Sequence, residues 1–384
     1  MKKIWLYDDP RSYGARAILR EAATGLREVG KDVRLYPYDP TQPNHIQLLK
    51  NDLETDQPDA ILLANHPSSL FLRQIGFRSP PCQIFVWIFD DPFLMGNEPY
   101  SPEEIVLVAD PRFSTAARQR KAQRILFLPV AAPVHPQAEV RTEYQHPVVY
   151  VGAAASVDAM RAQLPPFLAD YLDRIICLKT ENPAIEYDEL LTRHPLMEGK
   201  KITLTGQVAY YLYVESNRRL RLEYLKRLVP FGLRLFGNAE WLNQIRGTPL
   251  QECFAGGIDP FREYPDLIRS ATINLNLRSL QGYIVPTQRD FWVPAYGGFL
   301  LSSPHQKRID DWGMYDKKDR FHLSRFPWSP VCAAAEEAGK AVDFWLNHPR
   351  QRQEWIQSAS DIIQEHHTFA HRMEQLGEML DGMI

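Results

Sequence analysis

The stretch TQRDFWVPAYGGF at 287–299 places residues suited to phosphate binding on both sides of an aromatic, helix-like segment. Arg289, next to Gln288, could bind a phosphate through two guanidinium nitrogens at once. Gly297 and Gly298 lack a Cβ atom, so backbone amides there could approach a diphosphate closely. We therefore predict that this stretch forms one wall of a nucleotide-binding cleft.

Two further glycines in the same half of the chain follow apolar runs. Gly152 comes after VVYV, and Gly237 comes after LRLF. In open parallel sheets, ligands bind beyond the carboxyl ends of the strands. These two glycines, with those at 297 and 298, favour a ligand at the edge of a single sheet.

The first apolar run of the chain, KIWLYDD, leads into Arg11, Tyr13 and Gly14, ahead of a segment with helical spacing. Gly14 would let the backbone approach a ligand, and the start of a helix offers free amides to an anion. No GxGxxG pattern follows. A simple turn between a strand and a helix explains these residues equally well.

Two other loops of the first half carry candidate bases. His66 follows the run DAILLAN, and its near-neutral pKa would suit removal of a proton from a hydroxyl. Asp91 closes the run QIFVWIFDD, where paired carboxylates could act as a base or hold a metal. In each case a cap on the following turn is the alternative interpretation, because a proline comes next.

The elements that must position these residues follow from the alternation of apolar runs with helix-length segments. Near-continuous apolar runs of this kind are typical of parallel sheets covered on both faces. The stretch 131–147 holds three prolines and separates two such halves, so we predict domains at 1–140 and 146–365. A helical insert is expected at about 156–231, and a terminal helix at 366–384 could pack back on the first domain.

Length and composition limit the class of protein. The chain has 384 residues, 45% of them hydrophobic and 24% charged, with a formal net charge of -3. One core rarely serves a chain of this length, and the composition indicates neither disorder nor a nucleic-acid partner. Its start does not resemble a signal peptide, and no apolar run reaches the ~20 residues of a membrane helix.

The cysteines suggest a compartment. Cys82, Cys177, Cys253 and Cys332 form no CxxC pair and have no histidine at metal-ligand spacing. We therefore expect four buried thiols in a reducing cytoplasm, and no metal site.

The order of several short motifs resembles the CgeB-like (spore maturation protein) glycosyltransferase family. The matching features are the VGAA strand end, an arginine-rich helix before LRLFGNAEW, the segment YPDLIRSATINLNL, the run from Arg289 to GGFLL, and HHTFAHRMEQL. In the first half, FVWIFDDPF and ILFLPVAAP resemble the domain often joined to it. The resemblance implies an α/β protein of the GT-B fold, in which two Rossmann-like domains face each other across a cleft.

The resemblance also implies the reaction. A sugar would pass from a nucleotide-diphosphate donor, bound by the second domain, to an acceptor held mainly by the first. Catalysis would need no cofactor and no metal, because fixed positive charge and amides stabilise the diphosphate. The donor would lie among the residues already named in the second domain together with Asn238 and Asn276, with His66 or Asp91 as base. The acceptor, whether protein, lipid or glycan, stays open.

One position departs from the family. The residue three after Arg289 is commonly an acid that binds the donor ribose, whereas here it is Trp292, whose side chain has only a donor nitrogen. Trp292 could stack on a base or a sugar, or close the pocket. A lost donor site would instead make this a non-catalytic protein that binds a sugar or glycan. A two-domain periplasmic-type binding protein has the same architecture but would need a signal peptide.

Overall fold

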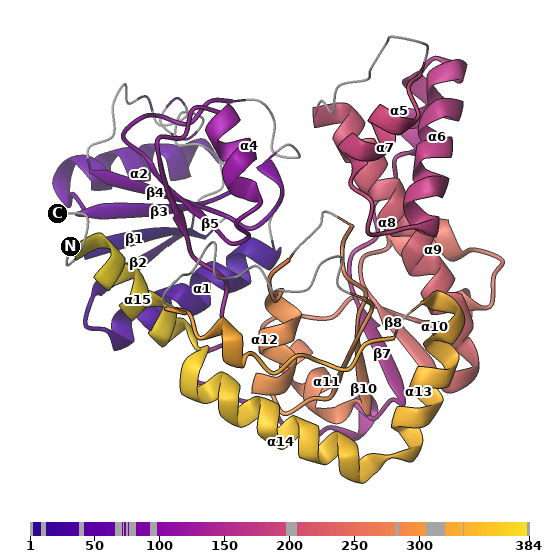
Figure 1. Ribbon diagram of the computed structural model, residues 1–384. Coiled ribbons are helices and arrows are strands. Elements are labelled where there is room, and N and C mark those ends of the chain that lie inside the picture. Colours follow the sequence, from indigo (N-terminus) through magenta and orange to yellow (C-terminus); the bar gives the residue numbers. More distant parts are fainter. Residues whose placement is uncertain are drawn as a thin grey trace.

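The computed structural model describes residues 3–8, 13–37, 42–65, 71, 73, 76, 82–92, 98–196, 206–280, 284–304, 319–332 and 334–381. The chain forms two parallel sheets, and helices flank each of them (Figure 1).

The first sheet has six strands in the order β2-β1-β3-β4-β5-β6, and its pairs are parallel. Both of its faces are covered, which explains why its strands are apolar at consecutive positions. One face packs on α1 and the other on α2 and α4. The bounds are β1 (Lys3–Asp8), α1 (Tyr13–Glu28), β2 (Asp32–Pro37), α2 (Pro43–Thr55), β3 (Ala60–Ala64), β4 (Gln83–Ile88), β5 (Ile105–Val108), α4 (Phe113–Gln119) and β6 (Arg124–Phe127).

The second sheet has five parallel strands in the order β11-β10-β7-β8-β9. The first strand of this domain along the chain, β7, is therefore the central strand of the sheet and lies between β10 and β8. The bounds are β7 (Val148–Val151), β8 (Leu233–Phe236), α9 (Glu240–Ile245), α10 (Leu250–Cys253), β9 (Phe254–Gly256), α11 (Tyr264–Ser270), β10 (Ile273–Asn276), α12 (Gln288–Ala295) and β11 (Leu300–Ser302). Short 3-10 helices lie at Thr142–Tyr144, Val229–Phe231, Leu323–Arg325 and Ala335–Glu337.

A helical insert follows β7 and has a hydrophobic core of its own. Its helices are α5 (Asp158–Gln163), α6 (Pro166–Glu181), α7 (Tyr187–Arg193) and α8 (Gly206–Leu228). Helix α8 joins the insert to the second sheet, because its first half packs in the insert core and its second half packs beside the strands. Figure 1 shows the insert rising beyond the second sheet, on the side that faces α4.

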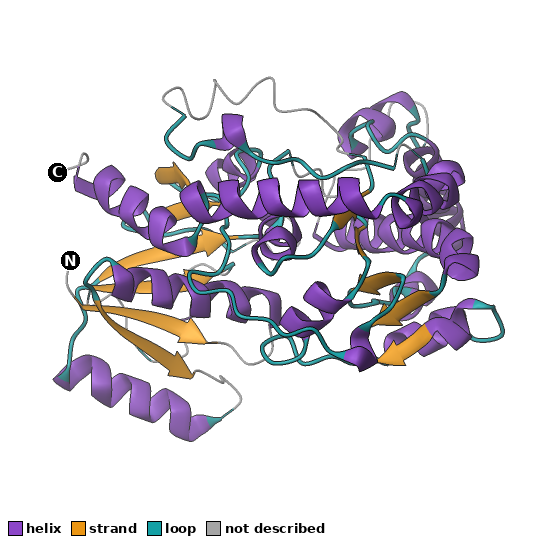
Figure 2. Cartoon of the chain, turned by 90° about the horizontal axis from the view of Figure 1, so that it is seen from below, coloured by secondary structure: helices purple, strands orange, loops and turns teal. Residues whose placement is uncertain are grey.

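The C-terminal helices return to the first domain. They are α13 (Ala338–Asn347), α14 (Pro349–His366) and α15 (Phe369–Asp381), and Figure 2 shows the chain crossing beneath both sheets. Helix α15 packs against α1 so closely that a Cβ atom on Gly25 would lie 2.4 Å from the carbonyl oxygen of Phe369. The returning chain also pairs with the linker that leaves the first domain: Ala132 N donates to His367 O (2.8 Å), and Phe369 N donates to Ala132 O (2.9 Å).

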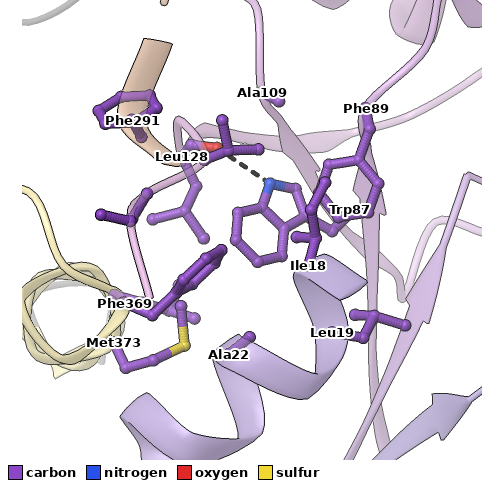
Figure 3. Close-up of a cluster of buried hydrophobic side chains, with 14 of the residues drawn as sticks. Ile18, Leu19, Ala22, Trp87, Phe89, Ala109, Leu128, Phe291, Phe369 and Met373 are labelled. Carbon is purple, nitrogen blue, oxygen red and sulfur yellow. Dashed lines mark hydrogen bonds between the residues drawn. The ribbon is translucent and has the colours of Figure 1, made fainter. Parts of the chain in front are cut away.

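The largest hydrophobic core belongs to both domains. It joins Ile18 of α1 and Trp87 of β4 to Phe291 of α12 and Phe369 of α15, as Figure 3 shows. The indole nitrogen of Trp87 donates to the carbonyl oxygen of Leu128, 2.9 Å away, at the start of the linker. The two Rossmann-like domains of this α/β protein are thus packed together, and the predicted GT-B fold class is confirmed.

The cysteines depart from one expectation. Cys253 and Cys332 are buried, whereas Cys177 is exposed on α6 and Cys82 is half-buried. The prediction of four buried thiols is therefore wrong for Cys177, because its position on α6 faces away from the insert core. Within the described ranges, no helix is long and apolar enough to cross a membrane.

Candidate functional site

The ends of β7 and β8 meet at a point where only glycine fits. Gly152 N donates to Phe236 O (2.9 Å), and Gly237 N donates to Gly256 O (2.9 Å). A Cβ atom on Gly237 would lie 2.2 Å from the carbonyl oxygen of Gly152, far inside van der Waals contact. These two glycines bring the backbone of the central strand ends together at the carboxyl edge of the sheet.

Asn238 shapes the loop that follows β7. Its side-chain oxygen accepts from Ala154 N and its side-chain nitrogen donates to Ala154 O, both at 2.9 Å. Trp241 Nε1 donates to Gly152 O (2.7 Å), and Gln244 Nε2 donates to Ala155 O (2.8 Å). Hydrogen bonds therefore fix the backbone of the loop at 152–155, which we call the β7 loop. The Asn238 side chain contributes by binding the backbone of Ala154.

Arg289 lies at the carboxyl end of β7. Its guanidinium donates to Val151 O and lies 5.6 Å from the ring centre of Tyr150. Burial alone would lower the pKa of Arg289, but the nearby hydroxyls of Tyr264 and Tyr150 raise it above its ordinary value. The charge is therefore fixed beside Gly152. Gln288, the first residue of α12, is half-buried next to it.

A second arginine lies at the β7 loop. Arg221 of α8 places Nη1 3.4 Å from Ala153 O, and its buried Nε has no hydrogen-bond partner among the described residues. The sequence offered a hint, since Arg221 lies in the arginine-rich segment. That segment predicts a solvated charged face, but Arg218 and Arg219 are half-buried, and their guanidinium groups bind the buried Glu215 on their own helix.

A buried network fixes the first turn of α12. Thr287 caps the helix, and its N–H and hydroxyl donate to Asp290 at 2.7 and 2.8 Å. Asp290 also pairs with Arg278 at 2.6 Å, with both side chains nearly inaccessible. Asn276, which we predicted to contact the sugar donor, places its Nδ2 3.3 Å from Asp290 Oδ1. Its side chain therefore belongs to this network.

The Arg278 guanidinium is only partly satisfied by this network. Its Nε and Nη1 are buried and have no hydrogen-bond partner in the part of the chain that the structure describes. Burial lowers the pKa of Arg278, although its charge persists because the ordinary value is so high.

Gly297 and Gly298 have a different role from the predicted one. They end α12: Gly297 N donates to Pro294 O (3.0 Å) and Gly298 N donates to Val293 O (2.9 Å). Gly297 has a φ of 75°, which favours glycine, and a Cβ on Gly298 would lie 2.7 Å from Ile268. Both amides are engaged at the end of α12 opposite to Arg289, away from the carboxyl edge of the sheet.

Trp292 also lies elsewhere than expected. It is buried in the core shared by the two domains, and its Nε1 donates to Ala131 O at 3.0 Å. An indole held in this way does not face a ribose or a base. Trp292 therefore contributes to the packing of the two domains.

The predicted residues of the first domain are only partly described. His66 and Arg11 lie outside the described residues, and Tyr13 is the first residue of α1. Gly14 is exposed in α1, and no atom of the described residues lies within 4 Å of the position that a Cβ would take, so packing within this part of the protein does not require glycine there. Asp91 is buried after β4, where it accepts a hydrogen bond from the Tyr213 hydroxyl of the insert at 3.3 Å.

Asp110, which follows β5, is a buried carboxylate that the sequence interpretation missed. It accepts Arg112 N (2.9 Å) in its own domain and Ile284 N (2.8 Å) in the second domain, and Val285 N donates to it as well. Burial raises the pKa of Asp110 to about 6. Its position at the end of the run IVLVAD was the available signal. Among the described residues, no group of three or more His, Cys, Asp or Glu could hold a metal.

Comparison with known proteins places the arginines within a recognised region. Residues 218–378 match the model of the family described as glycosyl transferase-like. The matched region contains Arg221, Arg278 and Arg289. No curated protein matches the sequence significantly.

Three solved structures resemble the chain over almost its whole length. The "putative UDP-N-acetylglucosamine 2-epimerase from Listeria monocytogenes" has a TM-score of 0.47 and 8% identity, covering 100% of this chain and 97% of that one. The S. aureus MnaA-UDP co-structure has a TM-score of 0.40 and 10% identity, with coverage of 99% and 96%. CalG4, the calicheamicin glycosyltransferase, has a TM-score of 0.34 and 10% identity, with coverage of 99% and 98%.

Proposed function

We propose that the protein is a glycosyltransferase that moves a sugar from a nucleotide-diphosphate sugar to an acceptor hydroxyl, without a bound metal. One observation carries the proposal: the Arg289 guanidinium lies against the carbonyl of Val151, the last residue of β7, and the Arg221 guanidinium lies against the carbonyl of Ala153 in the β7 loop. Both arginines belong to the region that matches the glycosyl transferase-like family.

The charge arrangement suits the bond that breaks. In glycosyl transfer, the bond between the anomeric carbon and the diphosphate oxygen breaks while a new bond forms to the acceptor oxygen. Negative charge grows on the diphosphate as it leaves. Cations fixed in advance, in a site of low dielectric, stabilise that charge without reorganising during the reaction. Arg289 and Arg221 are the groups to which we assign this role.

The acceptor proton needs a destination. If the reaction inverts the anomeric configuration, a base must take the proton, and the candidates are His66 and Asp91, which follow β3 and β4 along the sequence. If the reaction retains the configuration, a phosphate oxygen of the donor can take it. Nothing beyond the donor itself is needed as a cofactor in either case.

Thermal unfolding against a panel of nucleoside diphosphates and their sugars tests the proposal. A ligand that binds only the folded protein raises the melting temperature by mass action. We expect one base to stabilise the protein, and we expect Arg289→Ala and Arg221→Ala to reduce that shift. Arg227→Ala is the matched control, because Arg227 lies on the same helix as Arg221 and pairs only loosely with Glu336, at 3.6 Å.

Two outcomes would argue against the proposal. A wild-type protein that no nucleotide stabilises would not have a donor site. A protein that binds a nucleotide sugar but releases no nucleoside diphosphate with any hydroxyl acceptor or water would be a binding protein. In a transferase that inverts, Asp91→Asn or His66→Ala would remove the release of nucleoside diphosphate while preserving the melting shift.

A further inference from the structure

The connection between β10 and α12 is held at both of its described ends. Near its start, Asn217 of α8 accepts Leu280 N (2.7 Å) and donates to the Ser279 hydroxyl (3.1 Å). Near its end, the Asp110 carboxylate accepts the amides of Ile284 and Val285. The contacts with Asn217 come from within the second domain, whereas the contact with Asp110 comes from the first domain.

The Asp110 carboxylate joins the two domains through hydrogen bonds. Its side chain is fully inaccessible, and its two oxygens serve different domains: Oδ1 accepts Arg112 N, whereas Oδ2 accepts Ile284 N. A buried carboxylate without these amides would be strongly unfavourable. The Asp110 carboxylate therefore depends on amides from both domains, and the domains must be docked for it to have them.

The contact lies two residues from the cap of α12. Val285 is followed by buried Pro286, whose ring fixes φ, and then by Thr287, which forms a capping box with Asp290. Arg289 lies within that first turn. A movement of the Ile284 and Val285 amides would thus displace the start of α12, together with the guanidinium that lies at Val151.

We infer that Asp110 is a positioning residue of the donor site, which sets where α12 presents Arg289 and so makes nucleotide binding depend on the docking of the two domains. This inference rests on the proposed function. Asp110 does not touch the donor, and it acts through the Ile284 and Val285 amides. The kind of ligand is a nucleoside diphosphate, whose phosphates are the groups that Arg289 would bind.

The same segment makes a separate contact that provides a control. Two residues after Asp110, the Arg112 side chain pairs with Glu186 of the insert at 2.7 Å. Arg112→Gln removes this charge pair and keeps the backbone amide that donates to Asp110. It therefore separates the contact with the insert from the contact with the α12 connection.

The test measures the dissociation constant of the nucleoside diphosphate that most stabilises the wild type, by calorimetry, at a temperature where all variants are folded. The main variant is Asp110→Ser, because serine can still form the turn with Arg112 N but is too short to reach Ile284. Asp110→Asn is the second variant, with nearly unchanged volume and one acceptor oxygen fewer. We expect both to weaken binding by about tenfold, and Arg112→Gln to stay within about twofold of the wild type.

A double-mutant cycle with Arg289→Ala separates positioning from general destabilisation. If Asp110 acts through Arg289, its substitution should have no further effect on binding once Arg289 is absent. Wild-type affinity in both Asp110 variants, or effects that simply add in the double mutant, would overturn this inference and leave the proposed function standing. A wild type that binds no nucleoside diphosphate would overturn both.

Discussion

The indole nitrogen of Trp292 donates a hydrogen bond to the carbonyl oxygen of Ala131 at 3.0 Å, which joins α12 of the second domain to the linker that leaves the first. The ring itself is buried in the core that both domains share. A residue that the sequence associates with a ligand therefore stabilises the packing of two domains.

Substitution of Trp292 should lower stability more than nucleotide affinity. Trp292→Phe keeps most of the ring and loses the hydrogen bond, at a cost of ~1 kcal/mol, whereas Trp292→Ala leaves a cavity and should cost ~3–5 kcal/mol. Urea denaturation measures both values. If Trp292→Phe left stability unchanged and removed nucleotide binding, the result would favour the predicted role of Trp292 in stacking on a base or a sugar.

Asp110 should make stability fall as the pH rises from about 4 to about 6. Burial raises its pKa from 3.8 to about 6 in the folded protein. Over this interval the unfolded chain loses its proton before the folded protein does, so deprotonation favours unfolding by at most ~1.4 kcal/mol per pH unit. Urea denaturation of the wild type and Asp110→Asn across pH 4–7 gives the difference, which should decline to a plateau above pH 6. A difference independent of pH would contradict the shift.

The two glycines at 14 and 237 should respond in opposite ways to alanine. In Gly237→Ala the new Cβ would lie 2.2 Å from the Gly152 carbonyl oxygen, so overpacking should cost ~1–3 kcal/mol. Gly14→Ala adds a methyl group in open space on α1 and should change stability by no more than ~1 kcal/mol, in the stabilising direction. Thermal unfolding compares them directly, and equal effects would show that the tight contact at Gly152 is relieved at little cost.

The pair formed by Arg278 and Asp290 should be sensitive to the loss of one partner. Both side chains are buried, so Asp290→Asn would leave an uncompensated guanidinium and weaken the cap on α12, at a cost of ~3–5 kcal/mol. The double variant Arg278→Met with Asp290→Asn should recover part of that loss. Chemical denaturation of the three variants tests this, and a double variant less stable than Asp290→Asn would exclude an unpaired charge as the cause.

Removal of residues from His366 onward should destabilise both domains together. The deletion takes α15 away from α1 and takes Phe369 and Met373 out of the core that also contains Phe291 of the second domain. Calorimetry should show a lower, broader transition for the truncated chain. A first domain that melts at the temperature found in the full chain would contradict the shared core.

Much of the architecture could be predicted because it depends on local pattern. Apolar runs such as IVLV and VVYV became β5 and β7, because a parallel strand that is buried on both faces is apolar at nearly every position and can be recognised from that run. Arg289 likewise lies in the first turn of a helix, and a position of this kind is recognisable from the local pattern alone.

The candidate site was harder to predict because hydrogen-bond partners come from distant parts of the chain. Gly297 and Gly298 looked like phosphate contacts beside Arg289, but α12 separates them, and their amides close its far end. Arg221 shares a helix with Arg218 and Arg219, and only the packing of α8 beside β7 distinguishes it from them.

The sequence by itself determined two parallel sheets, a break between them, and an arginine at the start of α12. The tertiary structure alone decided that Arg221 joins Arg289 at the β7 loop, that Trp292 belongs to the domain interface, and that Asp110 holds Ile284. The physical reason is that periodicity and turn chemistry act over a few residues. A buried polar atom, in contrast, takes whichever partner the packed chain brings within about 3 Å.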